Sequence, residues 1–176
     1  MRVVAGKYRG VPLVSFDGFD VRPTSDRAKE SLFNILSSRV IGARFLDLFA
    51  GTGSMGIEAL SRSADKVTFV DSAKSSVDII KKNLAKVREN APVFCCDAVI
   101  FVKTTKEKFD IIFIDTPYNA GLYDGVLTAI EKSDILSDDG IIIVEKDDQN
   151  LCVPPQFAVY DTRRYGKANF MFLKRC

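Results

Sequence analysis

The sequence comprises 176 residues with a net charge of +2 at pH 7, 47% hydrophobic residues and no histidine. This length is enough for one domain with a substantial core. The lack of histidine excludes imidazole acid–base catalysis, histidine-based triads and most zinc sites. No apolar run approaches the ~20 residues that cross a bilayer, and the N-terminus shows no signal-peptide pattern, so we expect a cytoplasmic protein.

Charge is unevenly distributed along the chain. Residues 1–44 hold eight Lys/Arg and four Asp/Glu, and residues 159–176 hold five Lys/Arg and one Asp, so each end carries +4. The middle of the chain therefore carries −6. Basic ends are typical of segments that meet an anionic partner, although a chance scatter of surface charge gives the same pattern. The four cysteines show no C-x-x-C spacing, so we expect reduced thiols and no metal site.

The chain begins with two short apolar stretches around Gly6 and Gly10, which predict two short strands within residues 1–16. Residues 17–23 have the composition of a loop. Thr24 or Ser25 can cap a helix that follows. The apolar face of that helix would consist of Ala28, Leu32, Phe33, Ile35 and Leu36.

From residue 44 onward, strand-like runs alternate with helical segments. Strands are predicted over residues 44–49, 66–71, 92–96, 109–114 and 140–145, with helices up to residue 60, over 74–89, shortly after 96 and over 122–131. Residues 159–164 and 169–174 predict a closing hairpin. This alternation predicts an α/β fold with an open, mostly parallel sheet and helices on both faces. Such sheets bind ligands beyond the carboxyl ends of their strands.

A glycine-rich segment, DLFAGTGSMG over residues 47–56, follows the strand predicted at residue 44. It contains G-x-G-x-x-G, and its glycines let the backbone pass close to a ligand, so that a Cβ on Gly53 would occupy the ligand's path. Asp71 lies 20 residues after Gly51, where a carboxylate can accept both ribose hydroxyls of an adenosine. Both features are common to nicotinamide and S-adenosylmethionine sites.

Asp47 distinguishes these two cofactors. An acid four residues before Gly51 gives D-x-F-x-G-x-G, which resembles the first motif of class I methyltransferases. Their cofactor carries a cationic sulfonium and an ammonium, which an acid suits better than it suits a pyrophosphate. The alternative is an aspartate that only caps the end of the strand. The resemblance implies an S-adenosylmethionine site formed by Asp47, Phe49, Gly51, Gly53, Asp71, Asp97 and Ala98.

The segment Cys96-Asp97-Ala98 follows the third strand of this series. In the resembled fold, the aspartate accepts a hydrogen bond from the adenine amino group, and Ala98 supplies a backbone N–H. Asp97 could instead cap the next helix.

Asp115-Thr116-Pro117-Tyr118 follows the apolar run at residues 109–114 and is the most specific feature of the sequence. It resembles the D-P-P-Y motif of methyltransferases that act on exocyclic amino nitrogens of bases. The amine is a poor nucleophile because its lone pair is delocalised into the ring. The Asp115 carboxylate and the Thr116 carbonyl can accept its two hydrogens, which positions the amine toward the methyl group. Tyr118 offers a face on which a base can stack.

Thr116 departs from this pattern, which normally has proline there. Threonine keeps the backbone carbonyl, but the turn loses the rigidity of proline. We expect Thr116→Pro to be tolerated unless the Thr116 N–H is hydrogen-bonded.

The flanking segments narrow the resemblance. Residues 2–10, Arg22-Pro23-Thr24 and Tyr165-Gly166-Lys167 resemble bacterial 16S ribosomal RNA guanine-N2 methyltransferases of the RsmD type, and the likeness runs over nearly the whole chain. It implies a Rossmann-like class I methyltransferase domain with a seven-stranded sheet over residues 23–176, after a small β-hairpin and linker over residues 1–22. It also implies a 16S ribosomal RNA partner, and a monomer is expected. The expected phosphate contacts are Arg2, Lys7, Arg9, Arg22 and Arg27.

Three alternatives remain open at this point. One is an adenine-N6 methyltransferase of DNA or RNA, because the Asp115 motif serves both amines. The second is a nicotinamide-dependent oxidoreductase, which leaves Asp47 and Asp115 unexplained. The third is a non-catalytic RNA-binding assembly factor, for which Thr116 is the only support.

Overall fold

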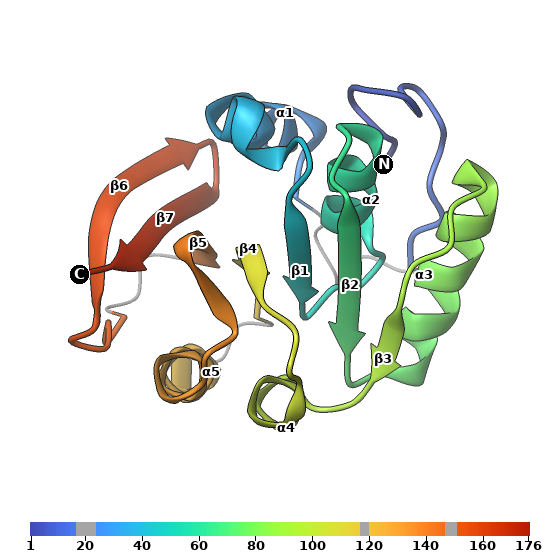
Figure 1. The fold of residues 1–176 in the computed structure, drawn as a ribbon. Helices are drawn as coiled ribbons and strands as arrows, with labels where there is room; N and C mark the ends of the chain where they lie inside the picture. Colours follow the sequence, from blue (N-terminus) through green and yellow to red (C-terminus); the bar gives the residue numbers. More distant parts are fainter. Residues whose placement is uncertain (17–23, 117–119, 147–150) are drawn as a thin grey trace.

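The computed structural model describes residues 1–16, 24–116, 120–146 and 151–176. The described strands form one sheet in the order β3-β2-β1-β4-β5-β7-β6 (Figure 1). The first five strands are parallel, and β7 runs antiparallel between β5 and β6. The strand bounds are β1 Arg44–Leu48, β2 Lys66–Asp71, β3 Val93–Cys95, β4 Phe109–Ile114, β5 Leu136–Lys146, β6 Phe157–Tyr165 and β7 Ala168–Arg175.

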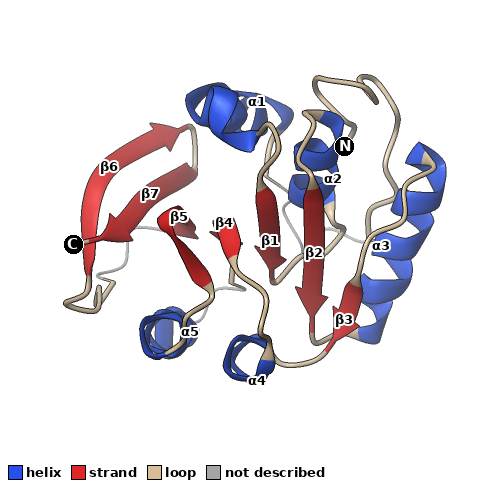
Figure 2. Ribbon diagram, in the orientation of Figure 1, coloured by secondary structure: helices blue, strands red, loops and turns tan. Residues whose placement is uncertain are grey.

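Helices cover both faces of the sheet (Figure 2). Their bounds are α1 Asp26–Leu36, α2 Ser54–Ser61, α3 Lys74–Val87, α4 Ala98–Thr104 and α5 Ala120–Lys132, with a 3-10 helix η1 over Ser37–Val40. Ser25 caps α1, because its Oγ accepts a hydrogen bond from the Ala28 N–H at 3.2 Å. The described helices include none that is long and apolar enough to cross a membrane.

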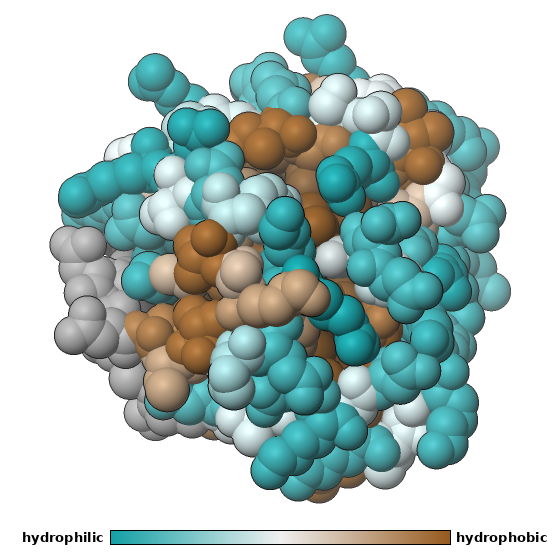
Figure 3. Space-filling view, turned by 60° about the vertical axis from the view of Figure 1, so that its left-hand side comes forward, coloured by the Kyte–Doolittle hydropathy of each residue, from teal (hydrophilic) through white to brown (hydrophobic). Residues whose placement is uncertain are grey.

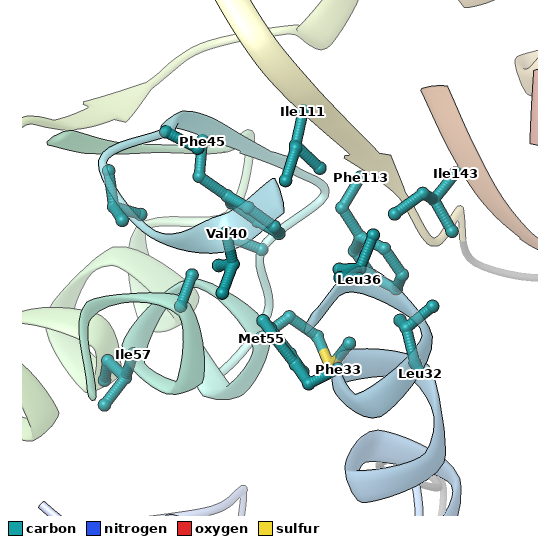
Figure 4. Packing of buried hydrophobic residues seen from close by; sticks show 14 of the residues in the cluster. Leu32, Phe33, Leu36, Val40, Phe45, Met55, Ile57, Ile111, Phe113 and Ile143 are labelled. Atoms are coloured by element: carbon teal, nitrogen blue, oxygen red, sulfur yellow. The ribbon is translucent and has the colours of Figure 1, made fainter. Parts of the chain in front are cut away.

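Two hydrophobic layers hold the helices against the sheet. Along β1, Phe45 faces the layer under α1, α2 and α3, and its neighbour Leu46 faces the layer under α4 and α5. Figure 4 shows the first layer, where Phe33 and Leu36 of α1 and Met55 of α2 point toward the sheet. The side chains of both layers are buried, and the parallel strands are accordingly apolar on both faces. On the side of β6 and β7, hydrophilic residues cover most of the surface and hydrophobic residues gather near its middle (Figure 3).

The expected seven-stranded, mostly parallel fold is confirmed, and most strand bounds agree within a few residues. The two strands expected within residues 1–16 do not form as regular strands. This N-terminal arm, residues 1–16, doubles back antiparallel, but it forms only an isolated bridge between Arg2 and Pro12. Its backbone bonds are shared between its own two halves and α2. The Val3 N–H donates to the Val11 carbonyl at 3.0 Å, whereas the Val4 and Ala5 N–H groups donate to the Glu58 carboxylate at 2.7 and 3.0 Å.

Candidate active site

The sheet register brings distant residues to one edge. Leu48 pairs with Val70 and with Ile114, and Ile114 pairs with Val144. The residues that follow these positions therefore lie side by side at the carboxyl edge, where parallel sheets bind ligands. In order across the sheet, they are Asp71, Phe49, Asp115 and Glu145.

The glycine loop, residues 49–53, turns at this edge through left-handed backbone. Phe49, Gly51 and Gly53 have φ angles of +59°, +54° and +76°. The Gly51 N–H donates to Asp71 Oδ2 at 2.8 Å, and the Ala73 N–H donates to Asp71 Oδ1 at 2.9 Å. Asp71 therefore fixes the loop while standing beside it at the end of β2.

The glycines of this segment differ in what surrounds them. A Cβ on Gly51 would meet only the Phe49 carbonyl oxygen, at 4.0 Å, so this glycine borders open space. A Cβ on Gly53 would lie 3.1 Å from Ile80 and 3.3 Å from Phe69, inside the core. The expectation that a Cβ on Gly53 would block a ligand is therefore wrong, and Gly51 is the residue with space for one. At Gly56 a Cβ would overlap the Phe69 ring, so this glycine allows α2 to pack closely on β2.

Asp47 lies beneath the loop. Its side chain is buried, and Oδ2 accepts a hydrogen bond from the Gly56 N–H at 2.8 Å. Burial raises the pKa of Asp47 to about 8, and the nearby charge of Asp71 acts in the same direction. Asp47 thus ties the end of β1 to the start of α2, and a role toward a cationic cofactor stays a prediction.

Asp97 and Ala98 begin α4 after the third strand of the parallel series. Asp97 Oδ1 accepts a hydrogen bond from the Ile100 N–H at 3.0 Å, so Asp97 is the N-cap of α4. Its side chain is exposed, whereas Ala98 is buried. The capping alternative is therefore what the structure shows, and a second role toward an adenine is not tested by it.

The end of β4 carries Asp115, which is half-buried, and Thr116, which is buried. Tyr123 of α5 lies next to them and donates its hydroxyl to the Glu145 carbonyl at 2.6 Å. Burial is the main cause that raises the pKa of Tyr123 to about 12; the neighbouring Thr116 opposes this shift, and the charge of Asp115 contributes to it. Pro117 and Tyr118 lie outside the described residues.

Two buried polar residues that sequence analysis missed connect the N-terminal arm to the loop region. Lys29 Nζ donates to the Arg2 carbonyl at 2.7 Å and to Ser54 Oγ at 2.8 Å. Asn83 Nδ2 donates to the carbonyls of Thr52, at 2.9 Å, and Val14, at 3.0 Å. Their positions in the sequence could have indicated burial, because Lys29 lies on the apolar face of α1 and Asn83 lies on the apolar face of α3. A polar residue on the apolar face of a helix can be buried only if it finds hydrogen-bond partners.

The arm and α1 present most of the expected phosphate contacts to solvent. Arg2, Lys7, Arg9 and Arg27 are exposed. Arg2 Nε lies 3.1 Å from Asp26, and Lys7 Nζ lies 3.5 Å from Glu89. Exposed pairs of this kind are weak and exchange readily for phosphate partners. Arg22 lies outside the described residues.

This strand order and the glycine loop at the carboxyl edge define a class I methyltransferase. The model of the family described as conserved hypothetical protein 95 matches residues 1–174, and the chain belongs to this family. It is 32% identical to ribosomal RNA small subunit methyltransferase D of Escherichia coli (strain K12), over 99% of this chain and 90% of the relative.

Two further comparisons agree. The ribosomal RNA small subunit methyltransferase D of Haemophilus influenzae is 34% identical over 97% of this chain and 91% of the relative. A solved structure from Escherichia coli, described as a methyltransferase, superimposes with a TM-score of 0.88 at 32% identity, covering 99% of this chain and 97% of that one. These matches favour methyl transfer over nicotinamide chemistry for the glycine loop.

Proposed function

We propose that this protein methylates the exocyclic N2 of a guanine in 16S ribosomal RNA, using S-adenosylmethionine and acting as a monomer. The observation that carries the proposal is the register between β1 and β4, which sets Asp115 directly beside the glycine loop. An acceptor for the target amine and a cradle for a methyl donor thus share one edge of the sheet. The relatives named for small-subunit ribosomal RNA support RNA as the substrate.

The residues at this edge suit S-adenosylmethionine. Gly51 borders open space where a Cβ would otherwise stand, so a ligand can approach the backbone there. Asp71 would accept the ribose hydroxyls, and Asp97 with Ala98 would bind the adenine. Asp47, Phe49 and Gly53 would form the floor of the site. When bound, the cofactor supplies a methyl group on a positively charged sulfur.

The chain's part in the reaction is to hold the amine. Asp115 and the Thr116 carbonyl would accept hydrogen bonds from the two N–H groups of the amine, which directs the nitrogen lone pair toward the methyl group. These acceptors would also stabilise the positive charge that develops on the nitrogen, and the methylated nitrogen would then release one proton to solvent. No strong base is required, which is consistent with a chain that has no histidine. Tyr118, with Pro117 shaping the turn, would stack on the base.

The basic groups of the N-terminal region would bind the RNA backbone. Each phosphate contact releases counterions, so binding should weaken steeply with salt. Because base edges are accessible in single-stranded loops, the target guanine would lie in a loop of the RNA. The residues proposed for these contacts are Arg2, Lys7, Arg9, Arg22 and Arg27.

The decisive experiment transfers a labelled methyl group onto small ribosomal subunits that lack the modification, and identifies the product nucleoside by mass spectrometry. We expect N2-methylguanosine in the 16S RNA. N6-methyladenosine would instead establish the adenine alternative, and no transfer would favour an assembly factor. Calorimetry with S-adenosylmethionine and with NAD, run in parallel, tests the cofactor independently of the substrate.

A further inference from the structure

The turn between β6 and β7 carries a cluster of cations. Residues 163–167, with the sequence RRYGK, hold three basic residues and no acid. Arg163, Arg164 and Lys167, which we call the basic turn, are all exposed. None of them belongs to the phosphate contacts expected from the N-terminal region.

The register of the sheet places this turn at the same edge as the candidate active site. Ile114 pairs with Val144, and Glu145, the next residue of β5, pairs with Phe170 of β7. Phe170 pairs with Arg163 of β6. One row of the sheet therefore leads from the Asp115 position through Glu145 and Phe170 to Arg163, with the rest of the turn beyond it.

The distance along this row is short. Neighbouring strands lie about 4.8 Å apart, so three steps put β6 about 14 Å from the end of β4. Figure 1 shows the β6–β7 turn beside α1, the helix that carries Arg27. An RNA strand that delivers a base to Asp115 would therefore pass within reach of both groups of cations.

The turn is held firmly while its charges stay in solvent. Tyr165 packs against the hydrophobic layer under α1, with its ring centroid 6.3 Å from that of Phe170. Gly166 turns the chain at a φ of +62°. Arg164 Nε donates to the Gly166 carbonyl at 3.3 Å, and Arg163 Nε lies 3.0 Å from Asp161. An anchored turn with exposed cations loses little conformational entropy when it binds phosphates.

We propose that the basic turn is a second RNA-binding surface, which grips the phosphate backbone on the β5 side of Asp115. The proposal rests on the proposed function and adds a contact on the side opposite the cofactor loop. The N-terminal region and the basic turn would then hold the substrate on both sides of the target base.

The test compares two variants with the same loss of charge. Arg164→Ala with Lys167→Ala removes two cations of the turn. The control, Lys103→Ala with Lys106→Ala, removes two exposed lysines near the end of α4, ahead of β4 and hence at the amino edge of the sheet. Binding of a single-stranded RNA oligonucleotide is measured from 50 to 200 mM salt, together with steady-state methyl transfer onto unmodified small subunits.

For the turn variant, we expect the slope of log K against log salt to fall by about 1.4, because each single-strand contact contributes about 0.7, and affinity at 0.1 M salt to fall roughly 25-fold. KM for small subunits should rise while kcat is kept, since the contact is equal in ground and transition states. Binding of S-adenosylmethionine and the melting temperature should match the wild type, and the control should resemble the wild type throughout.

If the wild-type protein methylates small subunits, an unchanged salt slope and an unchanged KM in the turn variant would overturn this proposal and leave the proposed function intact. An acidic protein would then be the candidate partner of the turn. Equal losses in both variants would overturn it too, because they would reflect net charge and not position. A wild-type protein without transfer activity would count against the proposed function instead.

Discussion

Lys29 Nζ lies 3.8 Å from Glu58 Oε2, and neither side chain has any exposed surface. The amine also donates to the arm and to Ser54, and Glu58 accepts from two arm N–H groups and from Arg62 Nε at 2.9 Å. Burial lowers the pKa of Lys29, and the charge of Glu58 opposes that shift. The buried charge of Lys29 is therefore tolerated because Glu58 is present, whereas Glu58 is balanced by both Lys29 and Arg62.

Lys29→Met should reduce the free energy of unfolding by up to about 3–5 kcal/mol, because it leaves the buried Glu58 with Arg62 as its remaining cationic partner and removes the donor to the Arg2 carbonyl and Ser54. The matched control is Lys7→Met, which removes a lysine from an exposed pair and should leave the free energy of unfolding nearly unchanged. Urea unfolding at constant ionic strength measures both. Similar losses in the two variants would show that the buried pair has no special weight.

Gly51→Ala and Gly53→Ala should separate ligand space from core packing. Both place a Cβ on left-handed backbone, so each should cost roughly 1–2 kcal/mol of stability. Gly51→Ala should in addition weaken S-adenosylmethionine binding, because its Cβ enters the open space of the site. In Gly53→Ala the Cβ meets Ile80 and Phe69, and the larger loss should be in melting temperature. Calorimetry and thermal melting of each variant decide the matter, and full cofactor affinity in Gly51→Ala would count against the site.

Asp115→Ala should nearly abolish methyl transfer. If Asp115 accepts a hydrogen bond from the target amine, removing its carboxylate should lower turnover by about 10² to 10³. The loss of one preorganised hydrogen-bonding group has an effect of this size in other enzymes. Affinity for S-adenosylmethionine should survive, since Asp71 holds the glycine loop independently. Single-turnover kinetics on small subunits, with calorimetry on the same preparation, provide the measurement. Retained turnover would remove Asp115 from the reaction, and lost cofactor affinity would assign it to the loop.

Asp47→Asn should change how stability depends on pH. The variant keeps an oxygen that can accept from the Gly56 N–H but removes the titrating group. In the folded protein the pKa of Asp47 is about 8, above the ordinary value of 3.8. The stability contributed by the protonated carboxyl is therefore fully present below about pH 4 and is lost as the pH rises toward 8. Wild type should lose unfolding free energy relative to Asp47→Asn between pH 5 and pH 8, as urea titrations at several pH values would reveal. If the difference in unfolding free energy between wild type and Asp47→Asn does not vary with pH, Asp47 is a carboxylate in the folded protein.

The sequence predicted the sheet well because its signals were local. Phe109–Ile114 reads as a buried strand and forms one, and Ser25 caps a helix as its position before an apolar stripe indicates. The edge that unites Asp71 and Asp115 also followed from the strands themselves, since parallel strands end at the same side.

The arm and the direction of single side chains could not be predicted in this way. The antiparallel pairing of the arm shrinks to an isolated bridge at Arg2 and Pro12, because Glu58, 54 residues from Val4, accepts the hydrogen bonds of the next N–H groups along the arm. The prediction that a Cβ on Gly53 would point toward the ligand was wrong, because a glycine motif does not indicate which side of the loop faces the core. The burial of Lys29 and Asn83 could be predicted from their positions on apolar helix faces. Their hydrogen-bond partners could not, because these lie in segments that come together only when the chain has folded.

The bond between Val14 and Asn83 spans 69 residues, and it sets an order of events during synthesis. At roughly 5–20 residues per second, the ribosome needs several seconds to make the chain between them. During that time the arm lacks the α3 side chain that holds its far end. Glu58 and Ser61 arrive earlier, so the beginning of the arm can dock onto α2 while its end still waits for α3. The first segment to be translated is therefore among the last to be completed, and in a nascent chain stopped before α3 the far end of the arm should be cleaved by proteases more readily than in the finished protein.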